Sequence, residues 1–244
     1  MGVMTREGTP RARARAAALE EIKRAARAQM AERGAAALSV RHVAREVGMC
    51  SSGVYRYFGS RDELLTALIL DAYNDLGTEV ETAESAVDRA DLFERWWSAA
   101  SAIRRWARAH PQEYGLVFGS PVPGYVAPQD TIVPAARVPF VLAAILRDAY
   151  EARLLADELI EAPQSDEPLR GIDPCFMTAG MPLEGLPEAV VAAGIRAWIE
   201  LFGLISFELF GHLTGSVLDG DRFFRIACER MARELGMLGV AAHA

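Results

Sequence analysis

The sequence predicts an all-α fold, with a small N-terminal helical domain joined to a larger helical domain. Apolar residues recur at steps of three and four along most of the 244 residues, which is the spacing of one face of an α-helix. No run alternates apolar and polar residues between hairpin turn signals, as a half-buried β-strand would. The apolar content of 51% and the charged content of 24% are ordinary for a globular protein with a sizeable core.

The N-terminal domain is expected to span residues 15–62, after a disordered arm of residues 1–14 that is rich in arginine. Its first helix has an apolar stripe at helical spacing and ends near Gly34. The residues of this stripe are Leu19, Ile22, Ala26 and Met30.

Two shorter helices follow in this domain. Ser39 belongs to the residue types that cap helix N-termini, and Gly48 is suited to end the helix that Ser39 begins. The third helix is expected over residues 51–57. The stripe of the second helix has the i, i+3, i+4, i+7 pattern and consists of Val40, Val43, Ala44 and Val47.

A longer fourth helix begins at a capping box, Ser60-Arg61-Asp62-Glu63, in which a serine is followed three residues later by a glutamate. The larger domain is expected over residues 63–240. Pro134 and Pro139 are expected to shape the start of its longest helix. The other predicted segments are helices over 92–109, 112–119, 131–160, 187–214 and 219–235, with a surface loop over 163–187 that is rich in proline and glycine.

Charge is distributed unevenly along the chain, whose net charge is −7. Residues 1–70 contain twelve Arg and Lys against seven Asp and Glu, a balance of +5, whereas the remainder has fourteen against twenty-six, a balance of −12. A basic segment on an acidic protein favours a surface directed at phosphates.

Composition also argues against several classes of protein. The three cysteines are scattered and form no C-x-x-C pair, so neither a disulfide framework nor a zinc site is predicted, and a cytoplasmic location fits best. The apolar stretch 195–213 contains Arg196, Glu200 and Glu208, which are expensive in lipid, so it is interpreted as a buried helix and no membrane partner is expected. No Glu-x-x-His pair, phosphate-binding glycine loop or G-x-S-x-G motif indicates an enzyme, and no cofactor or metal is predicted.

Two short helices joined by a glycine turn suit insertion of the second helix into the major groove of DNA. Ser51, Ser52 and Gly53 are small enough to let the backbone approach base edges. Arg56 can donate to guanine or to phosphate, and tyrosines at the end of the helix can donate to phosphates.

The segments Ser39 to Met49, Val54 to Phe58 and Ser60 to Leu65 together resemble the DNA-binding domain of the TetR family, over about residues 15–65. The resemblance implies that Tyr55, Tyr57 and Arg61 contact phosphates and that the first turn of the third helix faces bases. Cys50 departs from the pattern, because Ser or Thr is usual there. The candidate DNA-binding residues are Ser39, Arg41, Ser51, Ser52, Gly53, Tyr55, Arg56, Tyr57 and Arg61.

The remainder of the chain resembles the variable ligand-binding region of this family, and Trp198 to Leu213 is similar to an actinobacterial-type subgroup. The resemblance implies a pocket for a small, mostly apolar effector among the middle helices. For each aromatic residue there, packing in the core is an alternative to ligand contact. The candidate ligand-binding residues are Trp97, Trp106, Tyr114, Phe118 and Phe140.

The helix over residues 187–214 is apolar on nearly every side, so it must be covered both by its own domain and by a second subunit. A homodimer in which this helix and the last one form a four-helix contact satisfies that requirement. The candidate dimerisation residues are Trp198, Phe202, Ile205, Leu209 and Phe223.

These observations predict a dimeric, sequence-specific transcriptional regulator of double-stranded DNA. The preferred hypothesis is a repressor that a small-molecule effector releases from a palindromic operator. A regulator that works without a ligand, an architectural DNA-binding protein and an activator are the alternatives that the sequence leaves open.

Overall fold

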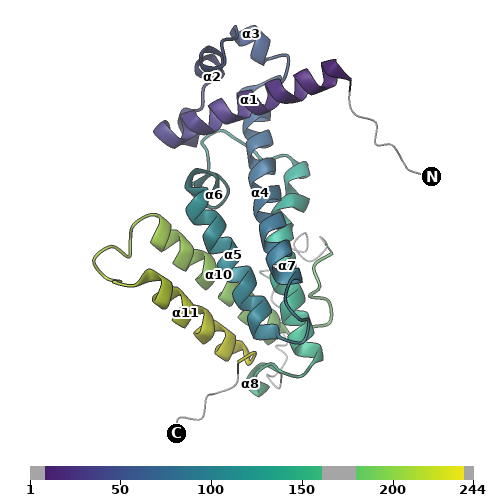
Figure 1. The fold of residues 1–244 in the computed structure, drawn as a ribbon. Helices are drawn as coiled ribbons and strands as arrows, with labels where there is room; N and C mark the ends of the chain where they lie inside the picture. Colours follow the sequence, from purple (N-terminus) through teal and green to yellow (C-terminus); the bar gives the residue numbers. More distant parts are fainter. Residues whose placement is uncertain (1–8, 161–179, 239–244) are drawn as a thin grey trace, which may run out of the picture. The chain divides into compact units, whose positions relative to one another are not determined.

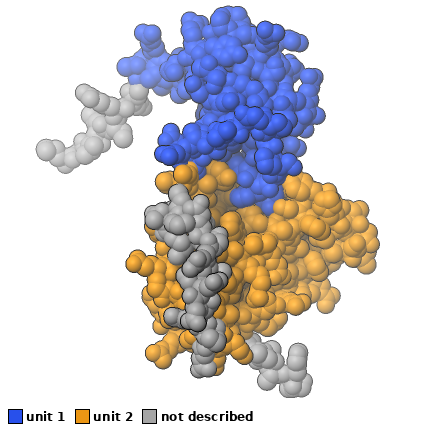
Figure 2. Space-filling view, turned by 180° about the vertical axis from the view of Figure 1, so that it is seen from behind, with its two compact units in different colours: residues 1–72, 112–131 blue, residues 73–111, 132–244 orange. Residues whose placement is uncertain are grey.

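The computed structural model describes residues 9–160 and 180–238, in which all regular structure is helical. This confirms the predicted all-α fold. The chain forms two compact units, one of residues 1–72 and 112–131 and the other of residues 73–111 and 132–244 (Figure 2). The predicted domain boundary between residues 62 and 63 falls inside one continuous helix, α4.

Unit 1 contains the N-terminal helices and one segment from the middle of the chain, residues 112–131 (Figure 1). Helices α4 and α6 each have residues in both units. The elements of unit 1 are α1 (Pro10–Arg33), η1 (Ala35–Ala37), α2 (Val40–Glu46), α3 (Ser51–Val54), the first half of α4 (Arg61–Ser85), α6 (Pro111–Phe118) and η2 (Gln129–Thr131).

The start of α1 corrects the predicted arm, because residues 10–14 are helical. Pro10 occupies the first helical position, where its missing N–H is no loss. Thr9 caps the helix, its hydroxyl accepting from the N–H of Ala12 at 3.3 Å. Residues 1–8 of the predicted arm lie outside the described residues.

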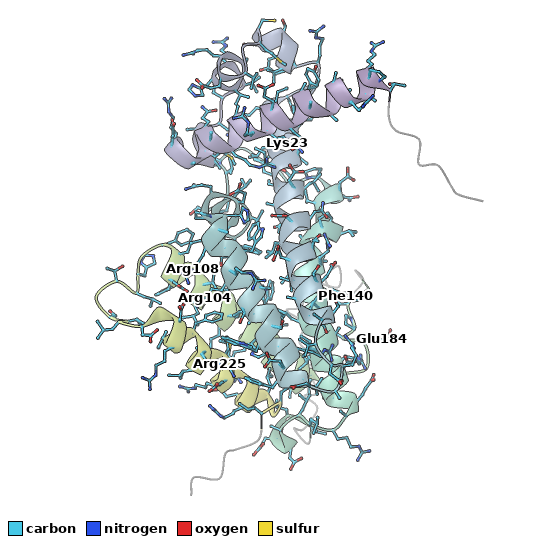
Figure 3. The ribbon with its side chains drawn as sticks, viewed as in Figure 1. Lys23, Arg104, Arg108, Phe140, Glu184 and Arg225 are labelled. Carbon is cyan, nitrogen blue, oxygen red and sulfur yellow. The ribbon has the colours of Figure 1, made fainter. Side chains whose placement is uncertain are left out.

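The core of unit 1 is built on the predicted stripe of α1, of which Ile22, Ala26 and Met30 are buried. They are joined in the core by residues of α2, α3 and α4. Two ion pairs also hold α4 against α1. Asp71 of α4 accepts from Lys23 at 2.8 Å and from Arg27 at 2.6 Å, both of which lie on α1 (Lys23 is labelled in Figure 3).

Unit 2 is a bundle in which α5 packs against α7, α10 and α11. The predicted helices over 92–109 and 219–235 are confirmed almost to the residue. The elements of unit 2 are the second half of α4, α5 (Leu92–Ala109), α7 (Ile132–Glu151), α8 (Asp157–Ile160), α10 (Glu188–Leu209) and α11 (Gly220–Leu235).

The longest predicted helix, over residues 131–160, is wrong in its last nine residues, because α7 ends at Glu151 and a separate short helix, α8, forms over Asp157–Ile160. Arg153 has φ +56°, the left-handed conformation that commonly ends helices, and the N–H of Leu154 donates to the carbonyl of Ala149 at 3.0 Å. No glycine marks this end in the sequence, which is why periodicity missed it. Pro139 lies inside α7 rather than at its start.

Two further boundaries complete unit 2. Helix α10 ends at Leu209, five residues before the predicted end at residue 214, and residues 210–216 form turns. Most of the predicted loop over 163–187 lies outside the described residues.

Candidate nucleic-acid interface and ligand cavity

The turn between α2 and α3 is built around Gly48, which has φ +66°. The N–H of Met49 donates to the carbonyl of Ala44 at 2.8 Å, closing the end of α2 in the way typical of a glycine C-cap. A side chain at Gly48 would be strained by this backbone conformation. The glycine therefore sets the angle at which α3 leaves α2, both of which lie on the same side of α1 (Figure 1).

Helix α3 and the turn over residues 55–57 that follows it present small and polar side chains to the outside. Ser52 and Arg56 are exposed, Tyr55 is 47% exposed, and Ser51 and Tyr57 are half-buried. Such a surface can enter a groove without steric obstruction.

Gly53 lies on the inner side of α3 and is buried. A Cβ built on it would meet the Cβ of Met49 and the Sγ of Cys50, each at 3.6 Å. These are ordinary van der Waals distances, so Gly53 packs against the turn and does not face outward as predicted.

Cys50 occupies the N-cap of α3 without a capping hydrogen bond from its side chain. Its sulfur lies 3.2 Å from the hydroxyl of Ser52. This contact lowers the pKa of the thiol, and a main-chain hydrogen bond from Gly53 adds to the effect. The cap that a Ser or Thr would supply here is lost.

Arg61 has internal partners instead of a free guanidinium. Its Nε donates to the carbonyl of Leu38 at 2.9 Å, and its Nη2 donates to the carbonyls of Ala35 and Ala36 at 3.4 and 3.2 Å. These bonds hold the start of α4 against the segment between α1 and α2. The predicted phosphate contact of Arg61 has to coexist with this structural role.

The start of α4 is capped as the sequence predicts. Ser60 Oγ accepts from the N–H of Glu63 at 3.0 Å. The carboxylate of Glu63 accepts from the N–H of Gly59 at 2.7 Å, one residue before the position that a standard capping box would use. This double contact fixes the chain that leaves α3.

Exposed arginines lie on α2 and α1, in the same unit as α3. Arg41 and Arg45 are exposed on α2, and Arg11, Arg13 and Arg15 are exposed on α1. The guanidinium of Arg15 lies 5.2 Å from the ring centroid of Tyr57. Sequence reasoning did not include Arg45 among the candidates, although its spacing of four from Arg41 puts both on one side of α2.

Ser39 starts α2, but its side chain makes no capping hydrogen bond. Its N–H instead donates to Oε1 of the buried Gln29 at 3.1 Å, and the amide of Gln29 donates to the carbonyl of Ala37 at 3.2 Å. Gln29 is thus the residue that ties α1 to the start of α2, a role that sequence reasoning missed.

Comparison with known proteins agrees with this geometry. Residues 22–68 match the family described as "Bacterial regulatory proteins, tetR family", and residues 96–231, more than half of the chain, match "Tetracyclin repressor-like, C-terminal domain". The chain belongs to the TetR family.

Curated relatives support the same assignment. The HTH-type transcriptional regulators Rv1816 of Mycobacterium tuberculosis and Mb1846 of Mycobacterium bovis are each 37% identical to this chain over 203 residues, which is 79% of this chain and 80% of the relative. This TetR-family chain is therefore a helix-turn-helix transcriptional regulator.

Solved structures show the same fold. The regulatory protein SCO4313 is 33% identical, with a TM-score of 0.69 over 91% of this chain and 98% of that chain. PfmR, a TetR-family regulator from Thermus thermophilus, is 21% identical, with a TM-score of 0.58 over 87% of this chain and 97% of its own, and shows the fold alone.

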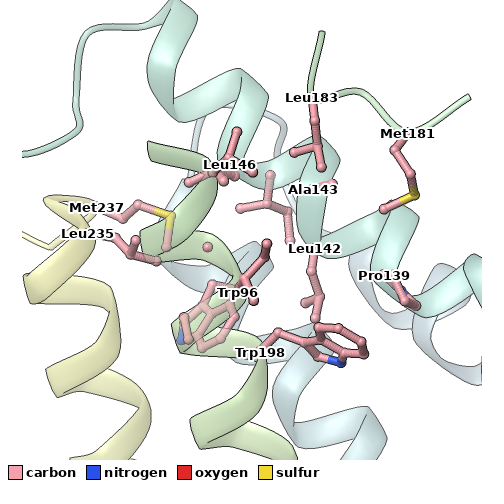
Figure 4. A pocket seen from close by; sticks show the side chains of 15 residues that line it. Trp96, Pro139, Leu142, Ala143, Leu146, Met181, Leu183, Trp198, Leu235 and Met237 are labelled. Atoms are coloured by element: carbon pink, nitrogen blue, oxygen red, sulfur yellow. The ribbon is translucent and has the colours of Figure 1, made fainter. Parts of the chain in front are cut away.

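Unit 2 of this TetR-family protein contains a partly enclosed apolar cavity of about 50 Å³ (Figure 4). Trp96 of α5, Leu146 of α7 and Trp198 of α10 contribute to its walls. Met181 and Leu183, from the segment before α10, close another side. The cavity lies wholly within one unit.

None of the five aromatic residues predicted to bind ligand lines this cavity. Trp97 borders a hollow with Arg104 and Phe224, and Phe140 borders another with Arg137.

The other three are placed by internal contacts. Trp106 is buried, and its Nε1 donates to Asp75 at 2.7 Å. Tyr114 and Phe118 belong to unit 1 and contact one another, with ring centroids 5.0 Å apart. The apolar cavity instead uses Trp96, the neighbour of Trp97, and Trp198, which sequence reasoning assigned to the dimer contact.

Helices α10 and α11 leave apolar side chains exposed, and the two helices pack against each other. The residues of this exposed apolar face, with their exposed fractions, are Ile199 (64%), Phe207 (55%), Phe210 (49%), Phe223 (41%) and Ile226 (50%).

The predicted dimerisation residues fall on both sides of these helices. Phe223 is exposed, Trp198, Phe202 and Leu209 are half-buried, and Ile205 is 1% exposed and belongs to the core of its own unit. The side of α10 that faces this core carries the buried residues Val190, Ala197, Leu201 and Ile205. By length and composition α10 could also cross a membrane, but it packs against α5, α7 and α11.

Proposed function

We propose that the protein is a sequence-specific regulator that binds a palindromic operator as a homodimer and is released by a small, mostly apolar effector. The observation that carries the proposal is the exposed outer surface of α3, held at a fixed angle by the Gly48 turn, with exposed arginines on the neighbouring helix α2 and at the start of α1. Small side chains admit the helix to the groove, and the arginines bind phosphates.

The candidate residues of unit 1 fall into two groups with different roles. Ser51, Ser52 and Arg56 read bases, since they lie on or near the exposed side of α3. Tyr55, Tyr57, Arg41 and Arg45 bind the phosphate backbone and fix the register of the protein on DNA. Arg61 supports this surface from within through its bonds to the main chain.

The homodimer forms through the exposed apolar face of α10 and α11. Large apolar side chains that are exposed together on two packed helices favour burial against a second copy. A twofold dimer presents two α3 helices about 34 Å apart, one turn of DNA, and the operator has matching symmetry.

The apolar cavity of unit 2 holds the effector. Its walls come from helices α10 and α11, among others, and these helices also carry the exposed apolar face. Effector binding therefore selects a dimer geometry in which the two reading helices no longer fit both half-sites. We propose a cytoplasmic protein that binds DNA and carries out no catalysis.

The decisive experiment is selection of random DNA fragments by the purified full chain at near-physiological salt, followed by sequencing. Enrichment of a two-armed palindrome supports a dimeric reader. Enrichment of a single arm contradicts the dimer, and no enrichment above random DNA contradicts sequence-specific binding.

Transcription in vitro from a promoter that carries the selected operator then tests the direction of regulation. A repressor lowers transcript yield, and addition of the effector restores it. An increase in yield on adding the protein would instead establish the activating alternative.

A further inference from the structure

We propose that the apolar cavity of unit 2 selects an uncharged ligand with a slender apolar part and rejects molecules of the same shape that carry an ionised group. The inference deepens the proposed function, on which it rests in taking this cavity as the effector site. Two observations support it: the apolar side chains of the cavity walls, and the partners of the arginines that are adjacent in sequence to wall residues.

Among the described residues, fifteen line the cavity, and none of these fifteen has an ionisable side chain. They are aliphatic and aromatic, with two methionines, Met181 and Met237. Transfer of a carboxylate or an ammonium group from water into such a site is costly unless a counter-charge accompanies it.

The arginines nearest in sequence to the wall residues are already engaged. Arg95, next to Trp96, is fully buried and donates to Glu84 at 2.6 Å and Asp148 at 2.8 Å. Its Nη2 is buried without a hydrogen-bond partner among the described residues, but Arg95 does not line the cavity, so a ligand there would not contact this guanidinium.

Arg147 and Arg196, which are also adjacent in sequence to wall residues, have partners outside the cavity. Arg147, next to Leu146, donates to the main-chain carbonyls of Pro182 at 3.0 Å and Glu184 (Glu184 is labelled in Figure 3). Arg196 lies 3.5 Å from Glu234. Neither cation lines the cavity, so a buried anion would find no counter-ion among them.

The bonds of Arg147 also build one wall. They attach residues 182–184 to α7, and this segment brings Met181 and Leu183 against the cavity. The cavity is thus closed by a segment that is held at its main chain while its apolar side chains remain adaptable. Methionine side chains adjust readily to the shape of an apolar ligand.

The size of the cavity limits what it can bury. A volume of 50 Å³ corresponds to roughly three to five water-sized sites, enough for a short alkyl chain or a small ring. A polar group of the ligand is tolerated where the cavity opens to solvent, but an ionised group cannot enter the cavity together with the alkyl chain of the ligand.

The test compares octan-1-ol with octanoate, two probes of the same chain length that differ in charge at pH 7.5. Titration calorimetry on the full chain measures both affinities. We expect octan-1-ol to bind at least ~30-fold more tightly, because octanoate must either leave its carboxylate in water or bury it unpaired. Equal or tighter binding of octanoate overturns the proposal.

Variants establish whether the probe occupies this cavity. Ala143→Leu adds volume inside it, whereas Ala144→Leu changes the neighbouring residue on the same helix, which does not line it. We expect Ala143→Leu to weaken octan-1-ol binding at least ~10-fold and Ala144→Leu to leave it within about twofold. Unchanged binding by a folded Ala143→Leu protein contradicts the assignment.

A second variant covers the case in which Ala143→Leu fails to fold. At Gly194 an added Cβ would lie 2.6 Å from Cδ2 of Leu146, so Gly194→Ala adds a methyl group to the cavity wall and displaces the Leu146 side chain, which also lines the cavity. We expect a loss of octan-1-ol binding here too. If neither probe binds the wild type, this inference is wrong, whereas DNA selection without any ligand tests the regulator itself.

Discussion

The indole N–H of Trp96 donates a hydrogen bond to the main-chain carbonyl of Cys228, with a nitrogen to oxygen distance of 3.1 Å. Trp96 lines the apolar cavity from α5, and Cys228 is a buried residue of α11. The other side of α11 carries exposed Phe223 and Ile226. One side chain thus connects the cavity wall to the helix that we propose to form the dimer contact.

Replacement of Trp96 by Phe keeps an aromatic wall but removes the donor to α11. We expect the free energy of unfolding to fall by about 1–3 kcal/mol, from the lost hydrogen bond and the smaller ring. Urea denaturation measures this. Trp97→Phe is the matched control, because Trp97 is half-buried and a smaller ring can still lie under Arg225, and it should cost less than half as much.

Arg95 and Arg89 bind the same two carboxylates, Glu84 and Asp148, but only Arg95 is fully buried. Replacement of Arg95 by Met leaves Glu84 with little solvent and one exposed partner, so we expect a loss of roughly 3–5 kcal/mol in unfolding free energy. Arg89→Met should cost less than about 1 kcal/mol, since its side chain is 63% exposed. Similar losses in the two variants would contradict this account of the cluster.

The division of roles at the DNA surface predicts two kinds of variant. Arg41→Ala should weaken binding to every sequence and reduce the slope of log affinity against log salt by about 0.9, because one phosphate contact is lost. Ser52→Ala and Arg56→Ala should change which sequences are selected. Fluorescence anisotropy on the selected operator and on random DNA measures both effects, and the same response to both DNAs from all three variants would refute the division.

The exposed apolar face predicts a variant that separates the subunits. Ile199→Lys places a charge at a position that is 64% exposed in one chain and buried in the proposed dimer. We expect sedimentation equilibrium to show a monomer, with operator binding at least ~100-fold weaker. Leu218→Lys is the control, because Leu218 is fully exposed in the turn before α11, and it should remain dimeric. A dimeric Ile199→Lys protein places the subunit contact elsewhere.

The two described cysteines should differ sharply in reactivity. The hydroxyl of Ser52 lowers the pKa of the exposed Cys50 thiol, whereas burial raises the pKa of Cys228 to about 12. A lowered pKa increases the thiolate fraction at a given pH, so Cys50 should be alkylated by iodoacetamide at pH 7.5 and Cys228 only after denaturation. Peptide mass spectrometry resolves the sites, and rapid labelling of Cys228 in the native protein would contradict its burial.

The helical fold and the candidate DNA-binding surface could be predicted from the sequence alone, because both depend on short-range chemistry. The stripe of Ile22, Ala26 and Met30, the glycine at position 48 and the capping serine at position 60 act within one or two helical turns. Local patterns of this kind can be recognised without knowing what lies across the core. The end of α7 at Glu151 could not be predicted in this way, because Arg153, two residues later, adopts a conformation that is usual for glycine.

Tertiary structure decided where the cavity lies and which side of α10 is exposed. Trp96 and Trp97 are adjacent in sequence, yet only Trp96 reaches the cavity, because successive residues on a helix point about 100° apart. Helix α10 is apolar on nearly every side, so its composition could not say whether Ile205 or Ile199 faces the core; the helices packed around it did. Likewise Arg61 has a sequence context typical of phosphate binding, but three carbonyl groups brought together by folding engage its guanidinium.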